Sequence, residues 1–429
     1  MKIHFIGIGG IGMSALARHY ISLGHSVSGS DQSSSEIITD LIDGGANIKI
    51  GHSRDNITPD INMVVYTAAI DNLNSELVSA RELVNMDASI KVLTYAEALG
   101  EMTKSKRTIA VCGTHGKTTT TAMAYEALKS AGVDASMILG SLIDYKGKKT
   151  NYIGGASDWI IIEACEYKRS FLNYNPEIII VTNIDSDHLD YYKDLKEIQE
   201  AFQQFVNRLP DNGELIVHKN EFDILNFKNK ILADDYSKND LNLSVPGEHN
   251  RNNAQLIVAL GNVMKLNGDN IREGLRNFKG TWRRQEYMGR HFNMECYDDY
   301  AHHPSEIKAT LQAFKELVKN KGGESGTGEK KVLAAFMPHL YSRTKLLLNE
   351  FAESFSDADE VILLPIYAAR EVQDTSISSE MLAEKIKGKG KAVKLVKDID
   401  EFKDYMQSRN NEGFVLVTMG AGDIYKVYK

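Results

Sequence analysis

The sequence predicts an α/β protein of three domains, each built on a mostly parallel sheet with helices on both faces. Short runs rich in β-branched residues alternate with amphipathic segments along the chain, as in parallel strands joined by helices. Two of these runs lead directly into glycine-rich turns. The chain of 429 residues exceeds one ordinary core. At roughly 100 to 200 residues per domain, three domains are a reasonable starting point.

The predicted strands fall into three groups. They are KIHFIGIG (2–9), SVSGSD (26–31) and MVVYTAA (63–69); TIAVCG (108–113), WIIIEA (159–164) and IIIVTNI (178–184); and KVLAAF (331–336), EVILLP (360–365) and FVLVTMG (414–420). Each group begins with or carries its own glycine-rich turn, so we place boundaries near residues 100 and 290. The predicted domains are 1–100, 101–289 and 290–429. One biased stretch, Lys321–Lys331, predicts a mobile surface loop.

Composition and charge exclude several classes of function. With 42% hydrophobic and 25% charged residues, the chain has the make-up of a globular protein and not of a disordered one. A net charge of −8 argues against a broad nucleic-acid or anionic-membrane surface, which needs clustered Lys and Arg. No segment approaches the roughly 20 apolar residues that span a bilayer. We therefore expect no nucleic-acid partner and no membrane insertion, while the oligomeric state stays open.

The cysteines and the start of the chain point to a cytoplasmic protein. Cys112, Cys165 and Cys296 lie far apart and form no CxxC pair, which argues against a disulfide framework or a zinc ribbon. The apolar start imitates a secretory signal, with an A-x-A pattern at Ala15–Ala17. Glycines at fixed spacing interrupt that run, and the pattern continues as strand, helix and strand. We therefore expect the N-terminal segment to be part of a folded domain, and we expect the protein to lie in a reducing compartment.

The first glycine-rich turn is GIGGIG, which contains Gly7, Gly9, Gly10 and Gly12. It follows a strand and opens a helix, so its amides and the helix N-terminus can face a diphosphate. Asp31 lies 19 residues after Gly12, at the end of the next predicted strand, where a carboxylate could accept ribose hydroxyls. This pattern predicts a Rossmann-like N-terminal domain. A nicotinamide cofactor, another diphosphate nucleotide and glycines that merely pack tightly all remain open.

The second glycine-rich turn, VCGTHGKTTTT from Val111, looks like a shortened phosphate-binding loop. Only Thr114 and His115 separate Gly113 from Gly116-Lys117, whereas a standard P-loop has four residues there. A strand precedes the loop and a helix is expected from about Thr118. The backbone from Gly113 to Thr119 would supply amides for phosphate oxygens, Lys117 would face the β and γ charges, and Thr118 would bind Mg²⁺. We predict ATP binding in a central P-loop ATPase-type α/β domain.

Further oxygen ligands for Mg²⁺ should come from the ends of neighbouring strands, where open α/β sheets place their sites. Glu163 ends the run at 159–164, while Asp187, His188 and Asp190 follow the run at 178–184. Each has a simpler interpretation. Glu163 could be a solvated strand-end carboxylate, and His188 could be a helix cap or a packed surface histidine.

Taken together, seven segments resemble the Mur ligases of peptidoglycan synthesis. In order along the chain they are GTHGKTTTTA, EACEYKRSFL, VTNIDSDHLDYY, PGEHNRNNA, YDDYAHHPSEI, MPHLYSRT and MGAGDI. The resemblance spans Lys2 to Lys429, and the shortened P-loop is the form that Mur and folylpolyglutamate ligases use. The resemblance implies that GIGGIG holds the diphosphate of a UDP-sugar and not a nicotinamide cofactor. It also implies a C-terminal Rossmann-like α/β domain that closes on the central one.

The resemblance implies ATP- and Mg²⁺-dependent amide formation through an acyl phosphate of UDP-N-acetylmuramate. The segment MPHLYSRT favours L-alanine as the amine substrate. Within the family, the alternative is a recycling ligase that adds a whole murein peptide. Outside it, the alternative is a catalytically inactive nucleotide-sugar-binding module, against which the intact Lys117, Thr118, Glu163 and His188 argue.

The family's residue roles carry over by motif. They imply that Thr118 and Glu163 bind one Mg²⁺ and that His188 binds a second. His249 and Asn253 would contact the adenosine end of ATP. Arg284, or Arg283 beside it, and Asp299 would reach the same nucleotide from the far side of the cleft. Tyr300, His302 and His303 would lie near the amino acid; a zinc site at this His pair is disfavoured because no Cys or H-E-x-x-H pattern accompanies it.

Two departures from the family pattern bear on the site. Cys165 and Lys168 stand where many members carry acidic residues beside the retained glutamate, so the local charge is less negative. Leu340 stands where some members carry an arginine that pairs with the amino-acid carboxylate. Arg343 is left as the expected partner of the alanine carboxylate, with His302 nearby. The alternative is a solvated arginine at the start of a helix.

Overall fold

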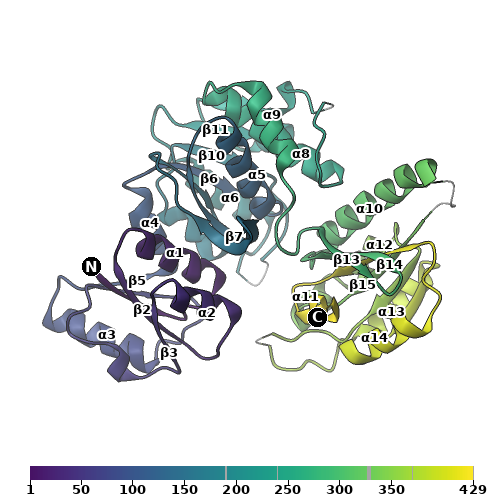
Figure 1. The fold of residues 1–429 in the computed structure, drawn as a ribbon, viewed down its shortest axis with the longest axis horizontal. Helices are drawn as coiled ribbons and strands as arrows, with labels where there is room; N and C mark the ends of the chain where they lie inside the picture. Colours follow the sequence, from purple (N-terminus) through teal and green to yellow (C-terminus); the bar gives the residue numbers. More distant parts are fainter. Residues whose placement is uncertain (189–190, 239, 326–329, 370, 429) are drawn as a thin grey trace. The chain divides into compact units, whose positions relative to one another are not determined.

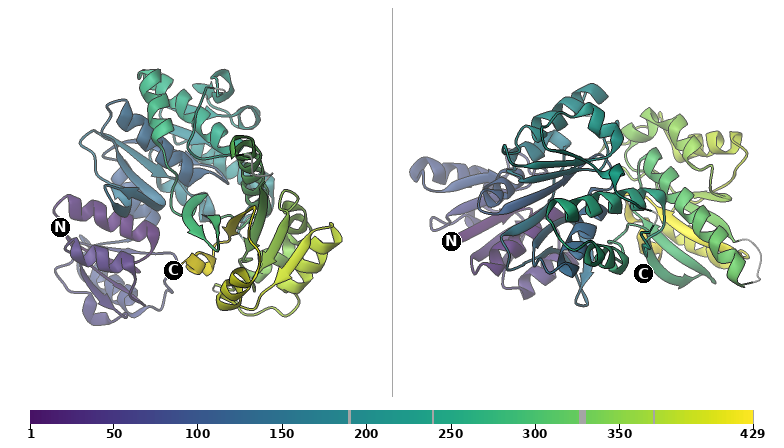
Figure 2. Two further views of the ribbon diagram at one scale, coloured as in Figure 1. Left: turned by 45° about the vertical axis from the view of Figure 1, so that its right-hand side comes forward. Right: turned by 90° about the horizontal axis from the view of Figure 1, so that it is seen from above.

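The computed structural model describes residues 1–188, 191–238, 240–325, 330–369 and 371–428 (Figure 1). Within them the strands form three sheets, of five, seven and six strands. Every run predicted as a strand belongs to one of these sheets, which confirms the α/β class. Figure 2 shows the helices that cover the sheets. No helix of the described part of the chain is long and apolar enough to cross a membrane.

The first sheet is entirely parallel, with strand order β3-β2-β1-β4-β5. This doubly wound order confirms the Rossmann-like prediction, because the chain crosses from β1 outward in both directions. Its strands are β1 (Lys2–Ile6), β2 (Ser26–Asp31), β3 (Asn47–Ile50), β4 (Met63–Tyr66) and β5 (Lys91–Thr94). Its helices are α1 (Ile11–Ser22), α2 (Glu36–Asp43), the 3-10 helix η1 (Arg54–Asn56), α3 (Ser75–Met86) and α4 (Tyr95–Thr103).

The second sheet has the order β12-β11-β10-β6-β9-β7-β8, in which only the edge pair β7 and β8 is antiparallel. Its strands are β6 (Arg107–Cys112), β7 (Ser136–Tyr145), β8 (Lys148–Ile153), β9 (Trp159–Glu163), β10 (Ile178–Val181), β11 (Glu214–Val217) and β12 (Lys230–Leu232). Its helices are α5 (Lys117–Ser130), η2 (Tyr167–Asn173), α6 (Leu195–Val206), α7 (Lys219–Ile224), η3 (Ala233–Asp235), α8 (Glu248–Val263) and α9 (Gly268–Asn277).

The third sheet has the order β13-β14-β18-β15-β16-β17, in which only the edge pair β13 and β14 is antiparallel. Its strands are β13 (Glu286–His291), β14 (Met294–Asp299), β15 (Lys331–Phe336), β16 (Glu360–Leu363), β17 (Ala392–Leu395) and β18 (Phe414–Met419). Its helices are α10 (Pro304–Ser325), α11 (Tyr341–Leu346), α12 (Leu348–Ser354), α13 (Ser379–Gly388), α14 (Ile399–Ser408) and η4 (Asp423–Tyr428).

The surface loop predicted at Lys321–Lys331 is wrong at its start, whereas the strand predicted at 331–336 is confirmed. Helix α10 continues through Ser325, and β15 begins at Lys331. Gly322 and Gly323 disfavour a helix by intrinsic propensity, so the composition of this stretch alone did not show that the helix continues through it. Residues 326–329 of this stretch lie outside the described residues.

Contacts within the chain define two compact units. The first contains Met1–Asn242 and Asn252–Phe278, which include the first and second sheets. The second contains Leu243–Arg251 and Lys279–Lys429, which include the third sheet. The division passes through α8, so one helix contributes residues to both units. The predicted boundaries at 100/101 and 289/290, which fall within α4 and β13, stay predictions.

A buried polar network joins three segments of the first sheet to the start of α3. Glu76 is fully buried, and its Oε2 atom accepts a hydrogen bond from Ser30 Oγ at 2.5 Å. The same oxygen lies 3.3 Å from His52 Nδ1 and 3.7 Å from His4 Nε2. Burial alone would raise the pKa of Glu76, but hydrogen bonds from His4, Asn56 and Ser30 lower it to about 2. The network therefore stabilises the ionised carboxylate.

This network predicts how stability depends on pH. Because the folded-state pKa of Glu76 is lowered from 4.5 to about 2, its contribution is complete above pH 4.5 and is lost as the pH falls towards 2. Glu76→Gln should lower the free energy of unfolding by about 2 to 3 kcal/mol at pH 7, and this difference should shrink by about half at pH 3. Urea unfolding followed through Trp159, with Trp282→Phe in both proteins, measures it.

The matched control for this prediction is Glu82→Gln on the same helix. Glu82 pairs with Arg54, and its side chain is 48% exposed. Exposed pairs contribute roughly 0 to 1 kcal/mol, so this variant should remain close to the native protein. If Glu76→Gln lowers the free energy of unfolding by the same amount at pH 7 and pH 3, the ionic role of Glu76 is contradicted.

Candidate active site

The glycine-rich turn of the first domain lies between β1 and α1. Gly7 donates its N–H to Ser30 O at 2.8 Å, and Gly10 is the N-cap of α1. At Gly12 a Cβ atom would lie 2.8 Å from Tyr95 Cζ, so only glycine fits against this ring. Asp31 Oδ2 accepts the N–H of Gly9 at 2.9 Å. Asp31 thus orders the loop, and its predicted contact with a ribose stays a prediction.

The shortened P-loop connects β6 to α5, as the sequence predicts. Gly113 has a φ of +134°, and a Cβ atom there would lie 2.0 Å from Thr182 Oγ1. Gly116 is the N-cap of α5, and the side-chain amide of Asn253 on α8 lies against it. The structure therefore brings Asn253, which the resemblance assigns to the adenosine end of ATP, against the predicted phosphate loop.

Residues that follow β10 hold the middle of the loop. Thr114 donates its N–H to Asn183 O at 2.9 Å and its hydroxyl to Asp185 O at 3.2 Å. His115 donates its N–H to Asn183 Oδ1 at 2.9 Å. Thr119 is buried in the first turn of α5. Sequence reasoning missed Asn183 and Asp185; their place in VTNIDSDH, directly after a buried strand, was the available signal.

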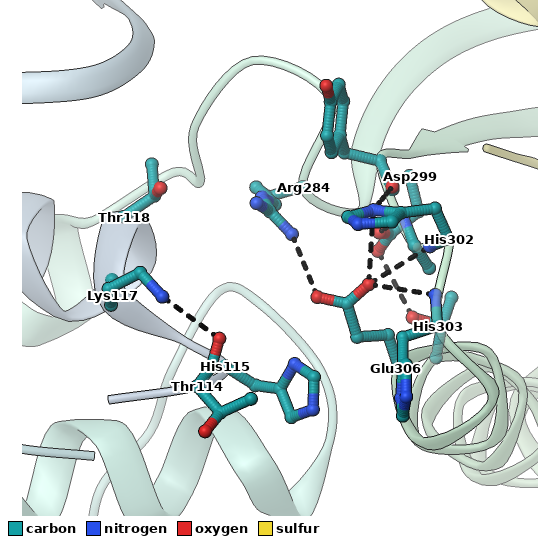
Figure 3. Close-up of polar contacts among 12 residues, drawn as sticks. Thr114, His115, Lys117, Thr118, Arg284, Asp299, His302, His303 and Glu306 are labelled. Atoms are coloured by element: carbon teal, nitrogen blue, oxygen red, sulfur yellow. Dashed lines mark hydrogen bonds and ion pairs between the residues drawn. The ribbon is translucent and has the colours of Figure 1, made fainter. Parts of the chain in front are cut away.

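Lys117 is buried beneath the loop and contacts a carboxylate that sequence reasoning missed. Its Nζ atom donates to Gly113 O at 2.5 Å and to Thr114 O at 3.0 Å, a contact that Figure 3 shows. It also donates to Glu166 Oε1 at 3.0 Å. Burial alone would lower the pKa of Lys117, but the charge of Glu166 holds it above its ordinary value. The ammonium group therefore stays charged where phosphates would bind.

Thr118 and Glu163 form a pair at the carboxyl end of β9. The Thr118 hydroxyl donates to Glu163 Oε2 at 2.9 Å and lies 3.1 Å from Oε1. Gly140 on β7 donates its N–H to Glu163 Oε2 at 2.8 Å. A hydroxyl and a carboxylate at this edge of the sheet are hard oxygen donors of the kind that Mg²⁺ prefers. The two residues predicted as ligands of one metal therefore lie together.

His188 lies beside Glu166. Its Nε2 atom is 3.6 Å from Glu166 Oε1, and its ring packs on Tyr167 with centroids 4.7 Å apart. His188 has a φ of 55°, a region that non-glycine residues rarely adopt. The histidine thus shares a carboxylate with Lys117. Asp190 lies outside the described residues.

The departures beside Glu163 have clear structural outcomes. Burial raises the pKa of Cys165 to about 12, so its thiol is neutral where many family members carry a carboxylate. Lys168 is exposed, and its ammonium group lies 5.5 Å from the Tyr167 ring. The acidic character next to Glu163 therefore rests on Glu166.

In the second unit, Arg283 and Arg284 differ sharply. Arg283 is buried, with Nε 2.6 Å from Asp298 Oδ2 and its two terminal nitrogens bonded to the carbonyl oxygens of Gly420 and Gly422. A guanidinium engaged on every side is structural. Arg284 lies over the Tyr300 ring at 5.3 Å and 3.8 Å from Glu306 Oε1. The arrangement favours Arg284 over Arg283 as the ligand-binding arginine.

Asp299 is buried and His249 is partly buried. Asp299 accepts N–H groups of Ala301 at 2.8 Å and Gln285 at 3.1 Å, and burial raises its pKa to about 6 against the opposing charge of Arg284. His249 lies 3.2 Å from Gln285 Nε2, and burial lowers its pKa to about 4. At neutral pH the histidine is therefore neutral and the aspartate ionised.

Tyr300, His302 and His303 surround the start of α10. The backbone N–H groups of His302 and His303 donate to Glu306 Oε2 at 3.0 and 3.2 Å (Figure 3). The Tyr300 and His302 rings meet edge to face at 5.4 Å. Glu306 was missed by sequence reasoning, although its place three residues after His303 is that of a helix-capping glutamate.

Arg343 lies in α11, near the histidines. Its Nη1 atom is 3.4 Å from His339 Nδ1, and the His339 and His302 rings lie 6.0 Å apart. Leu340, the N-cap of α11, has a φ of 72° and donates its N–H to Tyr367 O. The structure thus brings Arg343 and His302 into one cluster, joined by His339. His339 lies in the segment MPHLYSRT but was not predicted as a site residue.

Comparison with known families identifies the class. The model described as "Mur ligase family, catalytic domain" matches residues 2–107, "Mur ligase middle domain" matches 111–239, and "Mur ligase, glutamate ligase domain" matches 283–422. The chain belongs to the Mur ligase family, which confirms the resemblance seen in its sequence.

Among the described residues, no group of three or more His, Cys, Asp or Glu side chains is arranged to hold a metal ion.

Individual relatives are more specific. The chain is 42% identical to a UDP-N-acetylmuramate–L-alanine ligase of Clostridium kluyveri, over 99% of this chain and 96% of the relative. It is 40% identical to the ligase of the same name from Lachnospira eligens, over 100% and 97%. A crystal structure of UDP-N-acetylmuramate–alanine ligase from Thermotoga maritima is 28% identical, with a TM-score of 0.80 and coverage of 100% and 97%.

A more distant structure shares the fold alone. Folylpolyglutamate synthase of Mycobacterium tuberculosis, complexed with ADP and AMPPCP, is 16% identical with a TM-score of 0.59, and it covers 75% of this chain and 90% of its own. The three-domain α/β prediction is confirmed by these matches.

The raised pKa of Asp299 predicts a stability effect. Because the folded pKa is about 6 and the ordinary value is 3.8, the protonated form is favoured on folding. This stabilisation is complete below pH 3.8 and is lost as the pH rises through 6. Between pH 4.5 and 7.5 the free energy of unfolding of the native protein should fall by about 2 kcal/mol relative to that of Asp299→Asn.

Urea unfolding followed through Trp282, with Trp159→Phe in both proteins, reads this change in the second unit. The test compares the difference between the two proteins at the two pH values, so the hydrogen bonds that asparagine alters cancel. A difference that stays constant, or changes with the opposite sign, would mean that Asp299 is not shielded as described.

Proposed function

We propose that the protein is an ATP-dependent ligase that joins L-alanine to the carboxylate of UDP-N-acetylmuramate. The observation that carries the proposal is the group of Lys117, Thr118 and Glu163 at the phosphate loop: a buried ammonium, a hydroxyl and a carboxylate at the end of a parallel sheet. Relatives at 40% and 42% identity over nearly the whole chain bear the name of this ligase, which supports the choice of substrates.

The reaction would proceed in two displacements. A carboxylate oxygen of UDP-N-acetylmuramate attacks the γ-phosphorus of ATP, the bond to the β-phosphate oxygen breaks, and ADP leaves. The amine of alanine attacks the acyl carbon, the C–O bond to phosphate breaks, and phosphate and a proton leave. Phosphoryl transfer depends mainly on positioning and on neutralisation of charge. Lys117 would supply the protein's charge at the β and γ phosphates.

The residues present fit a magnesium ion. Thr118 and Glu163 would hold it, and the remaining ligands would be phosphate oxygens and water, as is usual for Mg²⁺. When bound, the ion supplies further neutralisation of phosphate charge. His188 would face a second ion, because Glu166 beside it adds a carboxylate to its imidazole.

The other predicted residues would bind the substrates. Gly7, Gly9, Gly10, Gly12 and Asp31 would hold the diphosphate and ribose of the UDP-sugar at the N-terminus of α1. Asn253, His249, Arg284 and Asp299 would bind ATP. Tyr300, His302 and Arg343 would bind alanine. We place the reaction in the cytoplasm, where ATP is available and where the free thiols Cys112, Cys165 and Cys296 stay reduced.

The test of this proposal is phosphate release from ATP. Release should require UDP-N-acetylmuramate and L-alanine together, and a murein tripeptide should not replace alanine. Lys117→Ala should reduce the rate by at least about a thousandfold, because it removes the main protein charge at the transferred phosphate. In a direct titration the UDP-sugar should bind without ATP, whereas NAD should not. Faster turnover with the peptide, or micromolar NAD binding, would refute the proposal.

The cluster around Arg343 predicts a selective effect on alanine. A free α-carboxylate needs a cationic partner, and a guanidinium can meet it with two parallel hydrogen bonds. Removing one member of a desolvated pair costs about 2 to 5 kcal/mol. Arg343→Ala should therefore raise the KM for alanine at least about thirtyfold and leave those for ATP and UDP-N-acetylmuramate within about threefold.

Steady-state kinetics in each substrate measure this change. Lys345→Ala is the matched control, because Lys345 lies on the same helix with its side chain 55% exposed and pairs with Asp374. Equal rises for all three substrates in Arg343→Ala would show that the arginine does not bind the carboxylate.

A further inference from the structure

The hairpin of β7 and β8 joins the central sheet to the first domain within one compact unit. The two strands pair antiparallel at the edge of the sheet, and α1 of the first domain packs against both. Asn151 on β8 is fully buried in this contact. A buried side-chain amide must find hydrogen-bond partners, and its partners show what it holds in place.

Asn151 bonds the first turns of α1. Its Nδ2 atom donates to Ile11 O at 2.6 Å and to Ser14 Oγ at 2.9 Å, which uses both of its N–H groups. Its Oδ1 atom accepts from Arg18 Nη1, and Arg18 in turn pairs with Asp40 at 2.7 Å. All donors and the acceptor of the amide are thus directed at α1 or at the arginine it carries.

The contacts of Asn151 fall where α1 meets the glycine-rich turn. Ile11 is the first residue of α1, between Gly10, its N-cap, and Gly12. The amides of this turn are the groups that would face the diphosphate of the sugar nucleotide. Asn151 therefore fixes the helix end that carries the binding loop, from outside the domain to which the loop belongs.

The other strand of the hairpin is fixed to the ATP site. Gly140 on β7 donates its N–H to Glu163 Oε2, and the same oxygen accepts the Thr118 hydroxyl. One strand thus contacts the carboxylate proposed to hold Mg²⁺, and the other contacts the start of α1. Between Gly140 and Asn151 the strand register shifts, and the pairs Ile138–Tyr152 and Ile143–Thr150 on either side hold the two strands together. The hairpin thus connects the two proposed substrate sites.

We propose that Asn151 is a positioning residue, which holds the UDP-sugar loop in register with the γ-phosphate of ATP through the β7–β8 hairpin. The inference rests on the proposed ligase function. The first displacement needs a carboxylate oxygen about 3 to 3.5 Å from phosphorus, and a misplacement of about 1 Å can cost a hundredfold in rate. Two substrates bound to different domains meet this requirement only when the two domains are held in a fixed position relative to each other.

If Asn151 only stabilised the contact between the hairpin and α1, the loss of other hydrogen bonds from that contact should change the kinetics equally. The chain offers a matched control for this alternative. Tyr152, the next residue, also joins the hairpin to α1, but at the far end of the helix: its hydroxyl lies 3.2 Å from His19 Nδ1 and 2.9 Å from Ser22 Oγ. Tyr152→Phe removes hydrogen bonds from the same contact surface without touching the turn at Ile11.

The experiment compares steady-state kinetics of Asn151→Ala and Tyr152→Phe with the native enzyme. In Asn151→Ala the KM for UDP-N-acetylmuramate should rise and kcat should fall, each at least about tenfold, while the KM for ATP stays within about threefold. In Tyr152→Phe the KM for UDP-N-acetylmuramate, the KM for ATP and kcat should each stay within about threefold of the native values. Equal changes in the two variants, or equal rises in both KM values in Asn151→Ala, would overturn the inference.

Ser14→Ala keeps the proposal testable if Asn151→Ala does not fold. It removes one acceptor of Asn151 and leaves Ile11 O in place, so the Kd for the UDP-sugar, measured calorimetrically without ATP, should rise about threefold or more. An unchanged Kd would overturn the inference. Failure of the ligase proposal looks different, because the native enzyme would then release no phosphate with UDP-N-acetylmuramate and alanine.

Discussion

An ammonium group held out of water beside a phosphate loop needs a carboxylate partner, and Lys117 has Glu166. Their side chains are 13% and 3% exposed. Removing one partner of such a buried pair costs about 3 to 5 kcal/mol, because the other charge is left without compensation. Several features of the site follow from this pair. The loop carbonyls of Gly113 and Thr114 share the ammonium, and His188 approaches the same carboxylate. Thr118 follows Lys117 directly in the sequence, and Glu163, which accepts the Thr118 hydroxyl, lies three residues before Glu166.

The strands that could be predicted are those at the centres of the parallel sheets. Runs such as 178–181 are buried on both faces and are therefore continuously apolar, which makes them visible in the sequence. Edge strands differ: β3 (NIKI) and β17 (AVKL) are short and partly exposed, and they carry lysines that protect a sheet edge. The antiparallel pairs β7–β8 and β13–β14 were missed as well, since neither contains a long β-branched run.

For the site, the placement of residues could be predicted where they lie close together in sequence, while their roles stay predictions. The loop from Gly113 to Thr119 and the strand-end Glu163 each follow a recognisable strand. The contacts that were missed are made by tertiary packing: Glu166 with Lys117, Asn183 with the loop, and His339 with Arg343. Sequence alone selected Arg284 by its motif but left Arg283 as an alternative. Only the fold distinguishes them, because it surrounds the first with Asp298 and the carbonyls of Gly420 and Gly422.

The close approach of Thr182 to Gly113 has a consequence for inhibition. A methyl group at Gly113 would overlap the threonine oxygen, because the two atoms would be only 2.0 Å apart, and the backbone there has a φ that other residues rarely adopt. Any side chain at this position would have to displace Thr182 or strain the backbone of the loop. A compound that bound through the amides around Gly113, instead of through exchangeable side chains, would contact a surface that point mutation cannot readily reshape. Resistance would then have to arise elsewhere, at residues that the compound need not touch.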